Sequence, residues 1–256
     1  MSWLWQGYSE VKLRNIALLL VATAPLVAHA EDWKGKGQAG LLISQGNTEA
    51  KSANAALELT RTADAWKHAF TAAALYGKSG EVQSAERWSI GWQSDRDITP
   101  RLFGFGALRY GRDKFSGFQY QATVSTGLGY KFIDTEPTKL TGRVGAGYRK
   151  FRPELITKDA SGAVISRTRL DSVGDAVLTA GIDYDHAFNE TTSLSNRFLV
   201  EAGSGNTLFT NNLALAVKMS DKLALSLGVN VQHNTKPPAG LKNRDVIETI
   251  NLVYAF

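Results

Sequence analysis

The chain has 256 residues, a formal net charge of +5 and no cysteine. Disulfide bonds and metal sites built on thiolates are therefore excluded. Lysine and arginine are interspersed with acidic residues rather than gathered in blocks, which argues against a nucleic-acid-binding protein.

Residues 1–30 have the features of a secretory signal peptide. Lys12 and Arg14 precede an apolar run over residues 16–27, and small residues at Ala28 and Ala30 occupy the two positions that a signal peptidase reads. The apolar run is about 12 residues long, which is too short for a membrane-spanning helix. We predict cleavage after Ala30, which leaves residues 31–256 as one domain in the cell envelope.

From Lys36 onward, segments of about 10–14 residues alternate apolar and polar side chains, and turn residues separate the segments. An alternation with a period of two is typical of β-strands. It predicts twelve strands, at residues 36–46, 51–63, 66–77, 85–96, 101–112, 118–132, 139–152, 169–187, 192–203, 207–219, 222–233 and 244–256. The fifth strand is ambiguous, because Phe103 and Phe105 have the opposite parity to Leu102, Leu108 and Tyr110.

Aromatic residues sit near both ends of several apolar rows. Trp66 and Tyr76 are ten residues apart on one row, and Tyr120 and Tyr130 repeat this spacing on another. At about 3.3 Å per residue and a 45° tilt, ten residues rise roughly 23 Å. The apolar band of an outer-membrane barrel is about 25 Å tall and has an aromatic girdle at each edge. We therefore expect an all-β fold, a transmembrane antiparallel up-and-down barrel of about 12 strands in the outer membrane of a Gram-negative cell.

The last segment, residues 249–256, is an alternating strand that ends in an aromatic residue. We expect it to close the barrel, with its apolar row toward lipid. Tyr254 and Phe256 resemble the C-terminal signal that the bacterial barrel-assembly machinery reads, although Asn251 stands where that signal usually has glycine. We predict that these two aromatic residues direct assembly. Glu248 shares the lipid-facing parity, and we expect it near the outer interface.

The connections differ in length in an alternating way. The long ones, residues 153–168 and 234–243, would lie at one end of the barrel, and the tight ones, residues 64–65 and 220–221, at the other. Outer-membrane barrels have long extracellular loops and short periplasmic turns. This pattern predicts that both termini are periplasmic. Basic residues in the outer loops could pair with phosphate groups of lipopolysaccharide, and solvated loop charges are the alternative.

The stretch over residues 113–136, followed by residues 140–148, resembles the YdiY-like salt-induced outer-membrane proteins, a domain family of unknown function. Residues 44–48 near the start and the Pro237-Pro238 loop near the end belong to the same resemblance. It covers nearly the whole mature chain and implies a barrel in the outer membrane. It implies no catalytic residues, because the matching motifs are turn and girdle positions.

The polar rows opposite the apolar rows should line the interior. They give these pore-lining candidates: Arg87, Gln121, Arg143, Arg149, Asp183, Arg197 and Glu201. Glycines on the same rows, among them Gly127, Gly129 and Gly145, are expected to widen the lumen. A barrel of about eight strands has an interior filled by side chains, and one of sixteen to eighteen strands leaves a channel, so twelve strands give an intermediate width. We expect a narrow passive pore or an envelope-maintenance protein, and the alternative is a closed structural or surface-interaction barrel.

An outer-membrane lipid hydrolase is a third hypothesis, since one twelve-stranded class uses a Ser–His pair. Such chemistry needs a histidine base beside a serine nucleophile. The candidates His68, His186 and His233 do not lie in a recognisable serine motif. Asp183 and Asp185 share a face, but the chain lacks the spacing of a metal site. We predict no enzyme activity, no metal and no cofactor.

Overall fold

The computed structural model describes residues 33–44, 50–160, 164–238 and 241–256; the predicted signal peptide lies outside these ranges. The described residues form thirteen strands: β1 (Trp33–Ser44), β2 (Ala50–Ala63), β3 (Trp66–Ser79), β4 (Val82–Asp97), β5 (Leu102–Asp113), β6 (Phe118–Asp134), β7 (Thr138–Lys158), β8 (Val164–Arg169), β9 (Val173–Ala187), β10 (Thr192–Gly203), β11 (Thr207–Lys218), β12 (Leu223–Asn234) and β13 (Arg244–Ala255). Within these ranges, no helix is long and apolar enough to cross a membrane.

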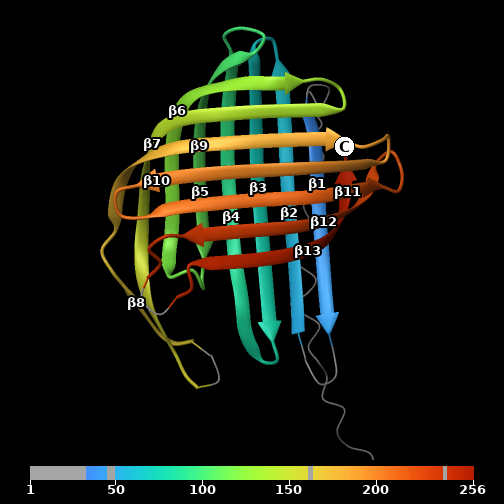
Figure 1. The fold of residues 1–256 in the computed structure, drawn as a ribbon. Coiled ribbons are helices and arrows are strands. Elements are labelled where there is room, and N and C mark those ends of the chain that lie inside the picture. Colours follow the sequence, from blue (N-terminus) through green and yellow to red (C-terminus); the bar gives the residue numbers. More distant parts are fainter. Residues whose placement is uncertain (1–32, 45–49, 161–163, 239–240) are drawn as a thin grey trace, which may run out of the picture. The chain divides into compact units, whose positions relative to one another are not determined.

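Twelve of the strands form a closed antiparallel barrel (Figure 1). Each strand pairs with its neighbours in the chain, except that β7 pairs with β9 and that β1 pairs with β13 to close the ring. This confirms the predicted fold class. The barrel has two ends. We call the end where β1 begins and β13 finishes the terminal end, and the opposite end the loop end.

The short strand β8 corrects the prediction of a plain connection over residues 153–168. At the loop end β7 continues to Lys158 and pairs with β8 as a hairpin outside the ring. The predicted eighth strand consequently begins later, at Val173. Proline has no backbone N–H to donate to a neighbouring strand. Pro153 is tolerated inside β7 because the pairing with β6 ends at Phe118, opposite the proline, and no N–H is needed there.

The two faces of the wall differ as a transmembrane barrel requires. Outward residues such as Val144 and Leu178 are 65% and 69% exposed, which suits contact with lipid. On β5 the parity is now settled: Phe103 and Phe105 are 3% and 8% exposed and point inward, and Leu102, Leu108 and Tyr110 take the outward row. The two phenylalanine rings can face inward because the residues opposite them on β6 are glycines, which leave room for the rings.

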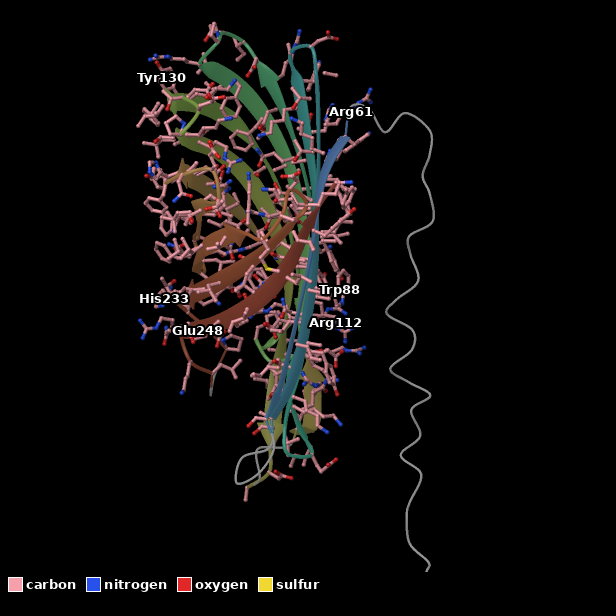
Figure 2. All side chains as sticks on the ribbon, turned by 90° about the vertical axis from the view of Figure 1, so that its right-hand side faces the viewer. Arg61, Trp88, Arg112, Tyr130, His233 and Glu248 are labelled. Atoms are coloured by element: carbon pink, nitrogen blue, oxygen red, sulfur yellow. The ribbon has the colours of Figure 1, made fainter. Side chains whose placement is uncertain are left out.

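Aromatic girdles surround both ends of the barrel, and Figure 2 shows the side chains on the wall. At the terminal end, Trp66 stacks on His68 at 5.8 Å and Tyr254 lies 6.1 Å from Phe256, measured between ring centroids. At the loop end, Tyr110 lies 5.3 Å from Trp88 and 6.0 Å from Tyr120. The spacing of aromatic residues seen in the sequence therefore corresponds to two bands.

A matched pair on β3 tests the inside–outside assignment. Ala72 faces outward between Leu57 and Ile90, and the adjacent Thr71 faces inward and is exposed. Ala72→Arg should destabilise the barrel by about 2–4 kcal/mol, because the guanidinium enters hydrocarbon. Thr71→Arg should have little effect. Denaturant unfolding in lipid vesicles measures both variants, and an equal loss of stability would refute the assignment.

Candidate functional site

The interior of the barrel is half filled. On the wall from β5 to β7, the Phe103 ring covers Gly129 and occupies the space that a Cβ at that glycine would need. The Phe105 ring covers Gly127 and Gly145, whose Cβ positions would lie 2.9 and 3.0 Å from it. These glycines hold aromatic rings, so the expectation that they widen the lumen is wrong.

The adjoining inner wall, from β1 to β4, includes several small residues. Ala69, Thr71 and Ala73 of β3 point inward beside Gly91 of β4 and Glu58 of β2. The side chains of Glu58, Thr71 and Ala73 are exposed. The accessible part of the lumen therefore lies along this wall.

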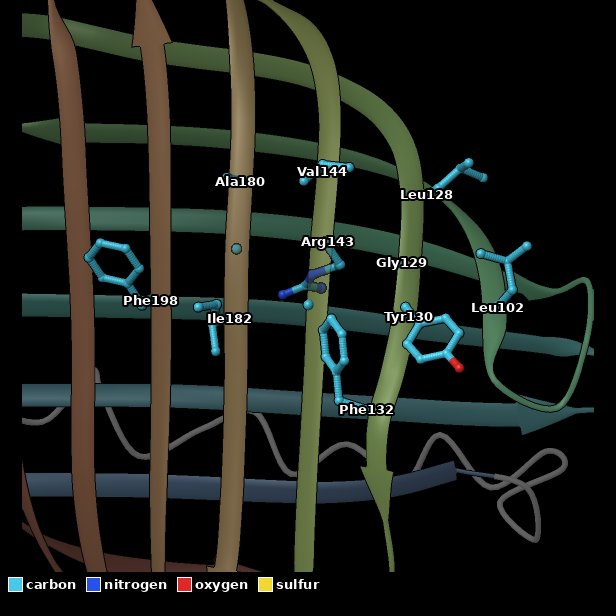
Figure 3. A pocket seen from close by; sticks show the side chains of 12 residues that line it. Leu102, Leu128, Gly129, Tyr130, Phe132, Arg143, Val144, Ala180, Ile182 and Phe198 are labelled. Atoms are coloured by element: carbon cyan, nitrogen blue, oxygen red, sulfur yellow. The ribbon is translucent and has the colours of Figure 1, made fainter.

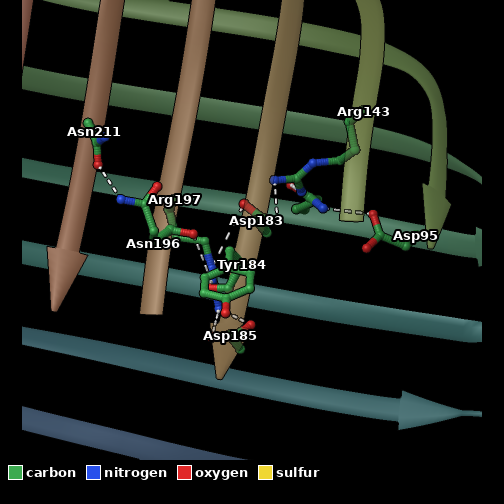
Figure 4. A network of polar contacts seen from close by, with 9 residues as sticks. Asp95, Arg143, Asp183, Tyr184, Asp185, Asn196, Arg197 and Asn211 are labelled. Atoms are coloured by element: carbon green, nitrogen blue, oxygen red, sulfur yellow. Dashed lines mark hydrogen bonds and ion pairs between the residues drawn. The ribbon is translucent and has the colours of Figure 1, made fainter. Parts of the chain in front are cut away.

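A polar network crosses the terminal half of the lumen (Figure 4). Arg143 of β7 forms an ion pair with Asp183 of β9, at 2.6 Å between Nη2 and Oδ2. Its Nη1 donates to Gln93 of β4 at 2.7 Å, and Gln93 in turn donates to Asp95 at 2.8 Å. Because β4 and β7 are not neighbours in the ring, the contact between Arg143 and Gln93 bridges the interior.

Arg197 extends this network. Its Nη2 donates to both carboxylate oxygens of Asp185, at 2.7 and 2.8 Å, and its Nη1 donates to the carbonyl oxygen of Tyr184 at 3.0 Å. The Arg197 Nε lies 3.8 Å from Asp183 Oδ1. Asp183 thus lies between two arginines. Arg197 and Asp185 are both about half exposed, so water reaches this pair and screens it.

Two further contacts bridge the loop half. Arg109 Nη2 of β5 lies 2.5 Å from Glu201 Oε1 of β10, and Glu201 is buried. Arg87 pairs with Asp113 at 2.7 Å, and its Nη1 also donates to Asn230 of β12 at 3.3 Å. Each of these arginines faces a carboxylate, so the lumen is not a uniformly positive channel.

Arg149 of β7 lies on the packed side of the interior, where the phenylalanine rings are, and its side chain is only 1% exposed. Its Nη2 donates to the carbonyl oxygen of Asn206 at 2.7 Å, and Asp175 Oδ2 lies 3.8 Å away. Within the described residues, Nε and Nη1 have no hydrogen-bond partner. The last candidate, Gln121, is half-buried on the inward row between Gly111 and Phe151.

The structure thus brings Arg143, Asp183 and Arg197 together and places Arg87 and Glu201 in separate contacts. The candidate set missed Arg109, the partner of Glu201. Arg109 has the same parity as Phe103 and Phe105, so the unresolved parity of the fifth strand concealed it. The contact itself could not be predicted, because it joins strands that are far apart in the ring.

The three candidate histidines lie on the outer face, in the girdles. His68 lies between Trp66 and Trp92, and His233 lies against Phe209. His186 hydrogen-bonds through Nδ1 with the Thr138 hydroxyl at 2.9 Å. Among the residues that the structure describes, no group of three or more His, Cys, Asp or Glu side chains could hold a metal ion.

The outer wall also carries an apolar groove of about 480 Å³ over β6, β7, β9 and β10 (Figure 3). The small residues Gly142 and Ala180 form the bottom of the groove, and the aromatic side chains of Tyr130, Phe132 and Phe198 form its sides. These side chains belong to outward rows, so the groove faces lipid rather than the lumen. It suits alkyl chains and offers no catalytic group.

Comparison with known proteins identifies the family. The model described as "Protein of unknown function, DUF481" matches residues 37–256. The chain belongs to this family. It is also 22% identical to the uncharacterized protein YdiY of Escherichia coli (strain K12) over 231 residues, which cover 87% of this chain and 83% of YdiY. Both findings confirm the resemblance seen in the sequence.

This DUF481 chain is also similar to solved structures. The NanC porin is 10% identical, with a TM-score of 0.48, and the alignment covers 87% of this chain and 98% of the porin. The translocator domain of the autotransporter NalP from Neisseria meningitidis is 14% identical, with a TM-score of 0.46 and 88% coverage of each chain.

The packing of Phe103 on Gly129 can be tested by substitution. Gly129→Val should destabilise the barrel by about 1–3 kcal/mol, because the new side chain must displace the ring. Gly106→Val is the control, since nothing lies within 4 Å of a Cβ at that outward position. Unfolding by denaturant in detergent micelles compares the two, and a Gly129 variant as stable as the Gly106 variant would contradict the packing.

Proposed function

We propose that this barrel is an integral outer-membrane protein that acts as a narrow passive pore for small polar solutes. The observation that carries the proposal is the exposed inner wall of β1 to β4. There Glu58, Thr71 and Ala73 remain accessible, while Phe103 and Phe105 fill the adjoining wall that begins at β5. Glu58 and Thr71 are polar, so water can occupy this part of the inner surface.

The outer wall supports the location. The exposed apolar rows and the two aromatic girdles match a bilayer, and the predicted signal peptide directs export. The loop-end connections include the β7–β8 hairpin and residues 235–243, longer than the turns at the terminal end. On this basis both termini are periplasmic, and the barrel-assembly machinery recognises Tyr254 and Phe256 during biogenesis.

Lipopolysaccharide is the lipid partner that this orientation implies. Lys150, Arg152 and Arg244 lie on outward rows at the loop end, opposite Ala122, Tyr120 and His233. Their side chains are placed where phosphate groups of the outer leaflet would lie.

A closed structural barrel is the second candidate. The contacts of Arg143 with Gln93 and of Arg109 with Glu201 cross the lumen and favour it. The two functions differ in one measurable property, which is conductance. No enzyme activity is proposed, because the described contacts of His68, His186 and His233 are with aromatic rings and with the Thr138 hydroxyl rather than with a serine.

Planar-bilayer recording of the refolded protein distinguishes the two. We expect small single-channel conductance in the wild type and a larger conductance in the double variant Arg109→Ala, Glu201→Ala, because a bridge across the lumen is removed. Val144→Ala on the outer face is the control and should conduct like the wild type. No conductance in any of the three would favour the closed barrel.

Arg143→Gln should shift the ion preference toward cations. Without the guanidinium, the carboxylate of Asp183 loses its closest partner and acts as a negative charge in the lumen. Reversal potentials under a salt gradient report the preference. A wild-type channel whose reversal potential ignores the substitution would place Arg143 outside the conduction path.

A further inference from the structure

The connection between β12 and β13 crosses the mouth of the barrel at the loop end. We call its described residues, 235–238 and 241–243, the strap. Around the ring, β1 to β4 separate β13 from β5, and β7, β9, β10 and β11 separate β6 from β12. The strap and the turn between β5 and β6 therefore start from opposite sides of the mouth. They are nevertheless in contact, and they lie beside each other in Figure 1.

The contact is made at Gly117, the residue before β6. Its φ of 77° is a conformation that residues with a side chain rarely adopt. A Cβ there would lie 2.8 Å from Pro238 Cγ and closer still to Leu241 Cδ1. The carbonyl oxygen of Gly117 accepts a hydrogen bond from the backbone N–H of Glu154 at 2.7 Å, which ties the turn to β7. The tip of the strap, Pro238 and Leu241, thus rests on a turn that the wall holds in place.

The base of the strap is held by amide groups. Asn206 Oδ1 accepts hydrogen bonds from the Lys236 N–H at 3.0 Å and from the Thr235 hydroxyl at 3.2 Å. Asn206 Nδ2 donates to Asn234 Oδ1 at 2.9 Å, and Asn243 Nδ2 donates to the Asn234 carbonyl oxygen at 3.0 Å. Asn206 and Asn234 are buried.

The two ends of the strap differ in what it costs to detach them. A buried amide that loses its hydrogen bonds leaves donors and acceptors unpaired, which is unfavourable. The contacts of Gly117 with Pro238 and Leu241 join carbon atoms, so their separation leaves no polar group unpaired. The tip is therefore the part that can lift while the base stays in place.

We propose that the strap is a gate at the loop end of the barrel. With its tip on Gly117 it closes the mouth. When the tip lifts, small polar solutes reach the exposed inner wall at Glu58 and Thr71. This inference rests on the proposed pore, because a gate has a function only in a barrel that conducts. It adds where the barrier lies and which segment moves.

A disulfide across the contact tests the gate, because the chain has no cysteine of its own. A Cβ at Gly117 would lie 3.1 Å from Pro238 Cβ, near the separation of about 3.5–4.5 Å that a disulfide needs. Gly117→Cys with Pro238→Cys should therefore crosslink on oxidation in vesicles. In planar bilayers the oxidised protein should conduct at least about tenfold less than the same protein after reduction.

Gly77→Cys with Ala85→Cys is the matched control. A Cβ at Gly77 would lie 3.2 Å from Ala85 Cβ, within the wall between β3 and β4. Oxidation of this pair should leave the conductance unchanged. A folded Gly117 and Pro238 pair that fails to crosslink would overturn the proposal, and so would a crosslink that leaves the conductance as it is after reduction.

A second variant requires no change at Gly117. Pro238→Ser with Leu241→Ser weakens the contact at the tip and should raise the conductance at least about twofold over the wild type. Leu155→Ser, at an exposed position of the β7–β8 hairpin, should conduct like the wild type. Equal conductance in the released, crosslinked and wild-type proteins would refute the gate alone. No conductance in the released variant would refute the pore, and the gate with it.

Discussion

The constraint on which this structure depends is that every backbone N–H and C=O in hydrocarbon must find a partner within the protein. An antiparallel sheet meets it only if the first and last strands pair. Here that closure rests on a short stretch, in which Gly35 and Phe256 exchange hydrogen bonds of 2.7 and 2.9 Å. The Phe256 ring lies where a Cβ of Gly35 would be. This terminal aromatic residue therefore belongs to the closing seam itself.

Steric fit decides how the interior is divided. Glycines on β6 and β7 accept the rings of Phe103 and Phe105, so one side of the barrel has a packed core. The other side has small residues with no matching rings, and there the polar side chains stay accessible. The contacts of Arg143 with Gln93, Arg87 with Asn230 and Arg109 with Glu201 cross the lumen between strands that are not neighbours. A barrel of this strand number can thus be partly solid and partly hydrated, which is why both a pore and a closed barrel are compatible with its size.

The sequence predicted the features that repeat locally. Alternation, aromatic spacing and turn residues were sufficient for the twelve barrel strands and for the inward parity of Arg143, Asp183 and Arg197. The β7–β8 hairpin was missed because Pro153 looks like the end of a strand. The contact of Arg109 with Glu201 and the coverage of Gly129 by Phe103 were missed because they depend on how neighbouring or distant strands are staggered. Local alternation sets which face a residue occupies but not which residue it meets across the barrel.

The β7–β8 hairpin is anchored at its base by several contacts. Arg167 of β8 donates to the carbonyl oxygen of Lys114 at 2.5 Å and lies over the Phe115 ring, and the buried Glu154 faces both Arg167 and Arg169. These contacts fix the base of the hairpin to the turn between β5 and β6. A molecule that contacted this base would meet a preorganised surface and would lose little binding free energy to conformational entropy.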